Sequence, residues 1–195
     1  MTPPRPEAST TDLAWLHTRL VVEAHAAGLL DLAYRVVDSP VGSLLVAATD
    51  AGIVRVAFAV EGHDDILDDL ATRISPRILE APARLDTATR QLDEYFHGRR
   101  RTFDLPLDLR LATGFRREVI VHLPEIGYGH TASYADVAAA SGSPRAVRAV
   151  GTACAKNPLP VIVPCHRVVR SDGGIGQYAG GVDAKRTLLR LEASA

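Results

Sequence analysis

The residues of this sequence best suited to chemistry are Cys165 and His166, which are neighbours in the stretch VIVPCHRVV. A thiol reacts as its thiolate, so a reactive cysteine needs partial exposure and a group that takes its proton. The β-branched run 161–163 predicts a short strand that ends at Pro164 and exposes the thiol. Neighbouring side chains on a strand point to opposite sides. We therefore expect either a sharp turn at Cys165 or a water molecule that links its sulfur to the imidazole.

Glu192 is the expected partner of the imidazole. In the C-terminal stretch VDAKRTLLRLEASA, a helical wheel places it on one face with Lys185, Leu188 and Leu189. A carboxylate on an apolar face is costly unless it has a partner. A histidine is the natural partner, because a carboxylate on one ring nitrogen orients the other toward a proton. The spacing leaves an alternative open, in which Glu192 extends into water near the C-terminal end of the sequence.

The composition narrows the remaining chemistry. The 195 residues contain two cysteines, Cys154 and Cys165, so the chain is no disulfide scaffold, and no closely spaced Cys/His set predicts a metal site. The sequence has no apolar run of membrane-spanning length, and its start, MTPPRPEASTTD, lacks the features of a secretory signal. We therefore expect a cytoplasmic protein with no membrane partner.

Charge divides the chain into two unlike halves. Residues 1–110 carry 12 Lys and Arg against 17 Asp and Glu, a net charge of −5, whereas residues 111–195 carry 10 against 6, a net charge of +4. An asymmetry of this kind points to a polyanion that binds the C-terminal half. An ordinary solvated surface explains the same counts, so charge alone does not identify a nucleic acid partner.

The acidic half predicts a helix, a sheet and two more helices. Residues 1–8 are expected to be a disordered tail, and Ser9 with Asp12 has the spacing of a capping box. An apolar helical stripe follows, made of Leu13, Leu16, Leu20, Ala24 and Ala27. We expect this helix to pack on the next domain, with assembly or contact with a partner as the alternatives. Runs between turn signals predict strands at 32–38, 43–49 and 53–59, helices at 64–74 and 86–97, and a period-two alternation at 103–109. This half shows no catalytic grouping, so we interpret it as a scaffold.

The basic half predicts a helix at 113–123 and then two helices separated by a glycine turn. Ser133 and Asp136 have capping-box spacing at the start of the first of the two. Ser143 is suited to cap the second, with Pro144 at its first position. The outline is that of a helix-turn-helix, a pattern that also occurs often by chance.

The second of these helices is predicted to have one small, basic face. Two sets of residues define its sides on a helical wheel: Arg145, Arg148, Ala149 and Thr152 on one, and Val147, Val150 and Cys154 on the other. Small side chains between arginines allow a close approach to a phosphate backbone. Cys154 belongs to the apolar side, and we interpret it as a small buried residue with no redox or metal role.

These residues lie in stretches that resemble a known family. The motif PCHRVV, preceded by AVRAVGTACAKNPLPVIV and followed by GGIGQYAGGVDAKRTLLRLE, resembles the O6-alkylguanine-DNA alkyltransferases, also called methylated-DNA–protein-cysteine methyltransferases. The stretch DSPVGSLLVAAT resembles the N-terminal domain of the family more loosely. The resemblance implies an α+β protein with a tail and extra helix at 1–31, a small ribonuclease H-like sheet-and-helix domain at 32–110, and a helical, winged helix-turn-helix-like domain at 111–195.

The resemblance also implies a reaction and a role for each matching residue. Cys165 would take the alkyl group from guanine O6 in a direct, irreversible displacement, so that each protein acts once. His166 would deprotonate Cys165 through a water molecule, with Glu192 orienting the imidazole. Tyr134 would donate a hydrogen bond to the guanine as its oxygen gains charge, and Lys185 would support the same pocket. No cofactor is implied, because the alkyl group arrives on the DNA.

The implied partner is double-stranded DNA that carries O6-alkylguanine. The second helix would lie in the minor groove, where Arg148 would fill the space left by the flipped nucleotide, with Arg145 and Thr152 also contacting DNA. Asn157 would fix the turn between this helix and the reactive cysteine. The wall of the base pocket would come from the stretch GQYAGG, with Tyr178, Ala179 and Gly180. We expect the protein to be a monomer.

Two positions depart from the usual family pattern, and three other functions stay open. Ile120 stands where a tryptophan is usual and Gly127 where a proline is usual, so we expect altered packing near Tyr134 but no loss of chemistry. A lesion-binding relative without transfer activity would lack the thiol of Cys165. A Cys/His/Glu hydrolase would need an oxyanion hole and leaves the basic helix unexplained. An alkylation-sensing DNA-binding regulator is compatible with the same residues.

Overall fold

A four-stranded sheet forms the first half of the chain in the computed structural model, which describes residues 10–193. Strands β1 (Leu32–Val37), β2 (Leu44–Thr49) and β3 (Gly52–Phe58) form an antiparallel meander, and β4 (Ile78–Glu80) pairs with β1 in parallel. The order across the sheet is β3-β2-β1-β4. The three predicted strands are confirmed, whereas β4 is not among the predictions because its three residues give too little pattern.

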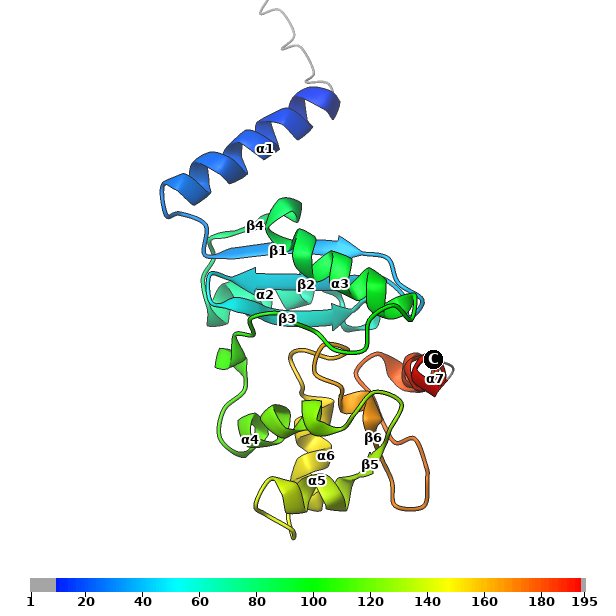
Figure 1. Ribbon diagram of the computed structural model, residues 1–195. Coiled ribbons are helices and arrows are strands. Elements are labelled where there is room, and N and C mark those ends of the chain that lie inside the picture. Colours follow the sequence, from blue (N-terminus) through cyan, green and yellow to red (C-terminus); the bar gives the residue numbers. More distant parts are fainter. Residues whose placement is uncertain (1–9, 194–195) are drawn as a thin grey trace, which may run out of the picture.

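Two helices cover opposite faces of this sheet, with α3 in front and α2 behind in Figure 1. They are α2 (His63–Arg73) and α3 (Asp86–Phe96), and both were predicted. Successive side chains of β2 alternate between the faces, so Leu45 joins the apolar cluster under α2 and Val46 joins the cluster under α3. Because both faces are covered, β2 is buried along its whole length.

The period-two alternation at 103–109 does not produce a strand. A single bridge joins Leu107 to Ile53, and the Ile53 amide donates to the carbonyl of Pro106 at 2.8 Å. Pro106 has no amide with which to continue a ladder, and a 3-10 turn follows almost directly. A Cβ at Gly52 would lie 2.2 Å from the Pro106 oxygen, so the close approach of these two segments requires glycine.

The first helix, α1 (Thr10–Ala26), extends away from the sheet (Figure 1). Val21 and Ala24 pack on the edge of the sheet domain, and His17 Nε2 lies 2.6 Å from the Glu80 carbonyl of β4. The leucines of the predicted stripe stay exposed: Leu13 57%, Leu16 49% and Leu20 51%. The expected packing of this helix on the domain is therefore confirmed only from His17 onward, where α1 reaches the sheet edge. The predicted tail and the cap at Ser9 lie outside the described residues.

The second half of the chain is mostly helical. Its elements are α4 (Phe115–His122), β5 (Ala132–Ser133), α5 (Tyr134–Ala140), α6 (Val147–Ala155), β6 (Val168–Val169) and α7 (Gly181–Ala193), with β5 and β6 paired in parallel. The predicted capping box begins α5, where the Ser133 hydroxyl accepts from the Asp136 amide at 3.1 Å and the Asp136 carboxylate accepts from the Ser133 amide at 2.9 Å. The protein is therefore of the predicted α+β class.

α6 begins later than predicted. The chain makes two successive turns after α5, the first at Gly142 with φ 73° and the second closed by the Ala146 amide, which donates to the Ser143 carbonyl at 2.8 Å. Ser143 and Pro144 are used by this second turn, and the helix starts at Val147 without a side-chain cap. Arg145 therefore lies in the turn, and its predicted position on the helix is wrong.

The two sides of α6 otherwise follow the helical wheel. Val150 and Cys154 are buried, and Arg148 and Thr152 are exposed. Val147 is 39% exposed, so its predicted place in the core is wrong. As the first residue of the helix, it lies beyond the part of α6 on which α4 and α5 pack.

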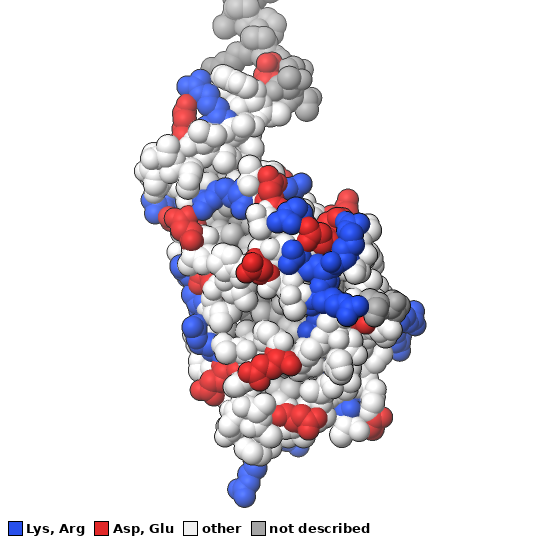
Figure 2. All heavy atoms as spheres, viewed as in Figure 1, with Lys and Arg blue, Asp and Glu red and all other residues white. Residues whose placement is uncertain are grey.

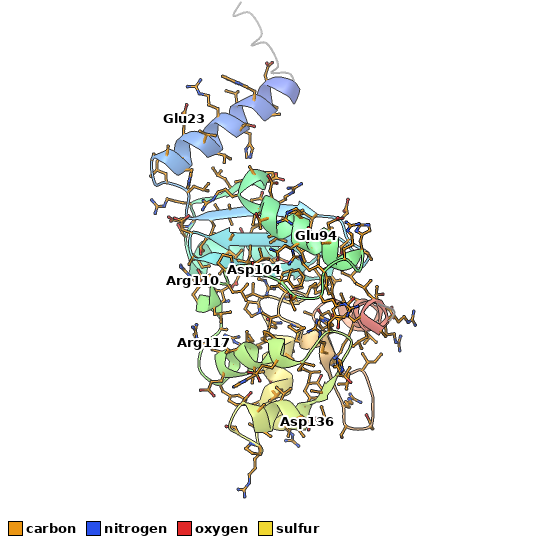
Figure 3. All side chains as sticks on the ribbon, in the orientation of Figure 1. Glu23, Glu94, Asp104, Arg110, Arg117 and Asp136 are labelled. Carbon is orange, nitrogen blue, oxygen red and sulfur yellow. The ribbon has the colours of Figure 1, made fainter. Side chains whose placement is uncertain are left out.

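One apolar core joins the two halves of the molecule. Its largest cluster of buried side chains includes Phe58 of the sheet together with Val119 of α4 and Leu188 of α7. Side chains from both halves fill the space between them (Figure 3). The Val56 amide also donates to the Pro158 carbonyl at 2.8 Å, which ties β3 to the segment after α6.

Candidate active site

Cys165 lies in a 3-10 turn, not at the end of a strand. The predicted strand at 161–164 is replaced by turns and bends. A buried side chain, Asn157, holds this shape: its Nδ2 donates to the Val163 carbonyl at 2.9 Å and to Cys165 Sγ at 3.1 Å, and its Oδ1 accepts from the Leu159 amide at 2.9 Å. Buried backbone groups need a partner, and here an amide side chain replaces the neighbouring strand.

The backbone of the same segment is strained at Val161. This buried residue has φ 72°, in the left-handed region that β-branched residues rarely adopt. The left-handed conformation costs an L-residue roughly 1–2 kcal/mol. The hydrogen bonds of Asn157 and the packed core around Val161 hold a conformation that an isolated chain would avoid.

The thiol of Cys165 is buried, with 2% of the residue exposed, which contradicts the expected exposure. Burial raises its pKa to about 11, although the hydrogen bond from Asn157 and the charge of Lys185 act in the opposite direction. The thiol is therefore protonated at neutral pH. It needs a base before it reacts as a nucleophile.

His166 is fully buried next to Cys165, and its Nε2 lies 2.8 Å from Glu192 Oε1. The alternative in which Glu192 extends into water is wrong, since the residue is 3% exposed and lies on the buried side of α7 with Lys185 and Leu188. Burial lowers the pKa of His166 more than the carboxylate raises it, so the imidazole is neutral at neutral pH. Its Nδ1 is buried and has no hydrogen-bond partner among residues 10–193. With the Nε2 proton directed at Glu192, Nδ1 is the free acceptor.

The carboxylate of Glu192 is held by four groups from distant parts of the chain. Besides His166, the Tyr95 hydroxyl donates to Oε1 at 2.7 Å, and the Gly129 amide donates to Oε2 at 3.3 Å. Arg167 donates to both oxygens, from Nε at 2.9 Å and from Nη2 at 3.0 Å. Burial alone would raise the pKa of Glu192, but these hydrogen bonds, with His166 the largest, lower it to about 2.

Tyr95 and Arg167 are site residues that the sequence analysis misses. Arg167 belongs to the PCHRVV motif, and an arginine inside an apolar run is a signal that could have been followed. Tyr95 gives no such signal, because it lies on α3 in the half interpreted as a scaffold, 97 residues from Glu192. The first half of the chain therefore contributes directly to the surroundings of the imidazole.

Lys185 and Tyr134 lie together on another side of Cys165. Lys185 is 1% exposed, its Nζ donates to the Val168 carbonyl at 2.6 Å, and Nζ lies 6.0 Å from the centre of the Tyr134 ring. Burial lowers the pKa of Lys185, while the sulfur of Cys165 acts in the opposite direction. Burial also raises the pKa of Tyr134, so its hydroxyl keeps the proton it can donate.

The stretch with Tyr178, Ala179 and Gly180 packs between the sheet and the imidazole. The ring of Tyr178 meets Phe58 of β3 edge-on at 5.4 Å between centroids, and meets His166 at 6.3 Å. A Cβ at Gly180 would lie 2.7 Å from the Phe58 ring, so only glycine fits there. This stretch therefore packs against both β3 and the imidazole of His166.

A hollow of about 470 Å³ lies beside these residues and is bordered by Tyr134, Arg148, Thr152 and Gly176. A Cβ at Gly176 would approach the Tyr134 hydroxyl to 2.8 Å, so glycine keeps this space open. Arg145 borders a different hollow on the turn before α6. The structure thus brings the tyrosine and the exposed side of α6 together, and leaves Arg145 apart from them.

Together these groups have the chemistry that a nucleophile, a general base and a residue orienting that base require. The thiol of Cys165 is protonated, His166 offers a free acceptor nitrogen, and Glu192 fixes the other nitrogen. Among residues 10–193, no group of three or more His, Cys, Asp or Glu side chains is placed to hold a metal ion. Over the same range, no helix is long and apolar enough to cross a membrane.

Family models match both halves of the chain. Residues 32–109 match the model described as "6-O-methylguanine DNA methyltransferase, ribonuclease-like domain". Residues 114–194 match the model described as "6-O-methylguanine DNA methyltransferase, DNA binding domain". The two matched domains and the buried cysteine in the second are those of a two-domain methyltransferase that uses a cysteine. α1 lies outside both models.

Individual relatives agree with this class. The chain is 40% identical over 159 residues to a methylated-DNA–protein-cysteine methyltransferase of Methanosarcina barkeri, with 82% of this chain and 96% of the relative covered. It is 42% identical over 160 residues to the constitutive enzyme of that name from Bacillus subtilis, with 82% and 94% covered. The chain belongs to the methylated-DNA–protein-cysteine methyltransferase family, as the resemblance implies.

Solved structures show the same arrangement of domains. The O6-methylguanine methyltransferase of Mycobacterium tuberculosis superposes with a TM-score of 0.74 at 37% identity, covering 84% of this chain and 93% of that one. A structure of the Mycobacterium tuberculosis protein in complex with DNA gives a TM-score of 0.72 at 38% identity, with 83% and 93% covered.

Proposed function

We propose that this protein repairs DNA by transferring the alkyl group of O6-alkylguanine to Cys165 in a single, irreversible turnover. Family membership supports the reaction. The observation that carries the proposal is the arrangement around the thiol: His166 follows it in the same turn, with one nitrogen held 2.8 Å from Glu192 and the other free to accept a proton.

In the proposed step, Nδ1 of His166 accepts the thiol proton through a water molecule, and Sγ of Cys165 attacks the alkyl carbon. The S–C bond forms as the C–O6 bond breaks, and its electron pair stays on the guanine oxygen. The proton then passes to the guanine, which leaves as the normal base. Tyr134 donates a hydrogen bond to the guanine while its charge develops. No cofactor takes part, and the thioether product ends the activity of that molecule.

Two further residues lower the cost of forming the thiolate. Asn157 donates a hydrogen bond to Sγ, and Lys185 places a positive charge nearby, and both lower the pKa that burial has raised. Lys185 is therefore proposed to support the pocket by stabilising the sulfur as well as by packing beside Tyr134.

For DNA binding we propose that α5 and α6 act as a helix-turn-helix, with α6 in the minor groove. Arg148 fills the gap left by the flipped nucleotide, while Thr152 and Arg145 contact the backbone, the latter from the turn before α6. Flipping costs a few kcal/mol, and less for a base that pairs poorly, as an alkylated guanine does. The wall of the base pocket is assigned to Tyr178, Ala179 and Gly180.

Three coarser expectations accompany this proposal. We keep the division into 1–31, 32–110 and 111–195, with the first half as a support for the second. One lesion occupies one thiol, so a monomer suffices for the reaction. A protein that repairs chromosomal DNA must act in the compartment that contains the chromosome. In a bacterial or archaeal cell that compartment is the cytoplasm, which is the location we propose.

The test is to incubate the protein with a duplex that carries one O6-methylguanine and to measure its intact mass. We expect the mass of one methyl group on the peptide that contains Cys165, at no more than one per protein, and none in Cys165→Ser. More than one turnover per protein, or no transfer at all, would contradict the proposal.

A further inference from the structure

A second charged hollow lies in the seam between the two domains, away from the thiol. Its volume is about 360 Å³, and it is bordered from the first domain by Arg55, Glu61, Asp69 and Arg73 and from the second by Arg116 and Lys156, among others. Four positive charges thus face two negative ones. A hollow with an excess of positive charge attracts anions.

The cations of this seam hollow are unequally paired. Arg55 has an ion pair with Glu61, and Arg73 has one with Asp69 at 3.1 Å. The second pair is half exposed and joins residues one helical turn apart, a kind that contributes little to stability and is easily exchanged.

The other two cations have no acidic partner among residues 10–193. Arg116 donates from Nη2 to the Leu111 carbonyl at 2.9 Å, and its Nε is buried without an acceptor in the described part of the chain. Lys156 is exposed and makes no ion pair within the same range. A buried donor without an acceptor is costly, and Arg116, which carries this donor, borders the hollow.

The seam hollow adjoins the surface proposed to bind DNA. Ala155, at the C-terminal end of α6, borders both this hollow and the one beside Tyr134 and Arg148. Lys156 follows directly after Ala155. A DNA strand that runs along the exposed side of α6 therefore reaches the seam hollow about one helical turn beyond Thr152.

We propose that the seam hollow binds a backbone phosphate of the DNA, between Lys156 and Arg116 of the second domain and Arg73 of the first. This inference rests on the proposed function and extends the DNA footprint onto the sheet domain. Phosphodiester oxygens fit because they are acceptors only and carry one charge, while the hollow supplies arginine and lysine donors. A free phosphate ion has the same chemistry, and the experiment separates the two sources.

The experiment measures affinity for an undamaged duplex over a series of salt concentrations, which avoids consumption of the thiol. The variants are Lys156→Gln and Arg73→Gln, alone and together. Loss of one phosphate contact lowers the slope of log K against log salt by about one, and we expect the double variant to bind about five- to tenfold more weakly at low salt.

Arg90→Gln is the matched control. Arg90 pairs with Glu94 four residues along α3, as Arg73 pairs with Asp69 along α2, but α3 covers the opposite face of the sheet. Figure 2 shows positive and negative side chains interleaved over α3, where Arg90, Arg99 and Arg100 pair with Asp93 and Glu94. We expect this variant to keep the slope and affinity of the wild type.

Two outcomes overturn the proposal. In the first, the double variant keeps the salt slope and affinity of Arg90→Gln. In the second, inorganic phosphate raises the melting temperature of the wild type but not of the double variant, and the DNA slope is unchanged, which makes the hollow a free-anion site.

Two controls keep the result decisive. If the melting temperature of the double variant is well below that of the wild type, the salt slope of Lys156→Gln alone is the test. This exposed side chain makes no ion pair among residues 10–193, so its substitution leaves no partner unpaired. Methyl transfer by the wild type is measured in parallel. Its absence would count against the proposed function while leaving the salt slopes to judge the phosphate site.

Discussion

The two cysteines of this protein make a natural comparison, because burial affects them alike and their neighbours do not. Cys154 is 6% exposed on the inner side of α6, and Cys165 is 2% exposed in its turn. Burial raises the pKa of both thiols, and raises that of Cys154 further. Burial therefore does not distinguish a structural cysteine from a reactive one. The polar groups around the sulfur make this distinction.

Those groups are found at Cys165. Asn157 donates to its sulfur, and His166 with its carboxylate partner follows in the same turn. Cys154 has no hydrogen bond from its sulfur among residues 10–193, and it packs in the apolar core. The difference is that Cys165, unlike Cys154, is buried together with a hydrogen-bond donor and an imidazole, the surroundings that a buried thiol needs to react as a nucleophile. Substitutions that remove these groups one at a time should separate their contributions.

The largest expected effect comes from the cysteines themselves. Cys165→Ala abolishes methyl transfer, whereas Cys154→Ala transfers at the wild-type rate within a fewfold and loses about 1 kcal/mol of stability. Intact mass after incubation with O6-methylguanine duplex measures the first effect, and thermal unfolding measures the second. A methyl group found on Cys154 in Cys165→Ala would contradict the comparison.

Removal of the base should come next in size. His166→Gln is expected to slow transfer at neutral pH by about 10²-fold or more, the usual contribution of a general base. In this variant the rate should rise about tenfold per pH unit toward the thiol pKa of about 11, because hydroxide replaces the missing base. The wild-type rate should be flat near neutral pH. Equal pH profiles for the two proteins would show that the imidazole is not the base.

Removal of the donor should have a smaller effect. Asn157→Ala deletes the hydrogen bond to the sulfur and is expected to raise the pKa of Cys165 and slow transfer by about tenfold. Titration of the thiolate by its ultraviolet absorbance checks the pKa in the Cys154→Ala background, where one thiol remains. A circular dichroism spectrum controls for the turn, because Asn157 also bonds to Val163 and Leu159.

The last expected effect is on stability in acid and leaves the transfer rate at neutral pH out of account. The pKa of Glu192 in the folded state is about 2, below its usual 4.5, so the folded state binds this proton at a lower pH than the unfolded state does. Its contribution, on the order of 3 kcal/mol, is present above pH 4.5 and is lost as the pH falls toward 2. Denaturant unfolding over this window should show the loss in the wild type and not in Glu192→Gln. The same slope in both would exclude Glu192 as its source.

Much of the fold was predictable, because local patterns determine it. The meander, the capping box of α5 and the buried side of α7 all follow from periodicity and turn residues within a few positions. The start of α6 and the segment 161–164 were not predictable in this way. There the chain follows a second turn and the side chain of Asn157, which override the preference of β-branched residues for a strand.

The site was predictable where its residues share one segment or one helix face. Cys165, His166 and Glu192 are identified by the motif and the helical wheel, and the contact between His166 and Glu192 is the one expected. The burial of the thiol and the role of Tyr95 depend on packing between domains, which no local pattern encodes.

The Tyr95–Glu192 hydrogen bond has a consequence for how the protein folds. It joins residues 97 positions apart, and long loops of this kind close late, after local helices and hairpins have formed. Until α3 and α7 dock, the carboxylate has lost one of its four partners and the imidazole its fixed orientation. A newly made chain should therefore complete the surroundings of Cys165 in the last steps of folding, so the ability to transfer an alkyl group should appear only after the two domains have docked.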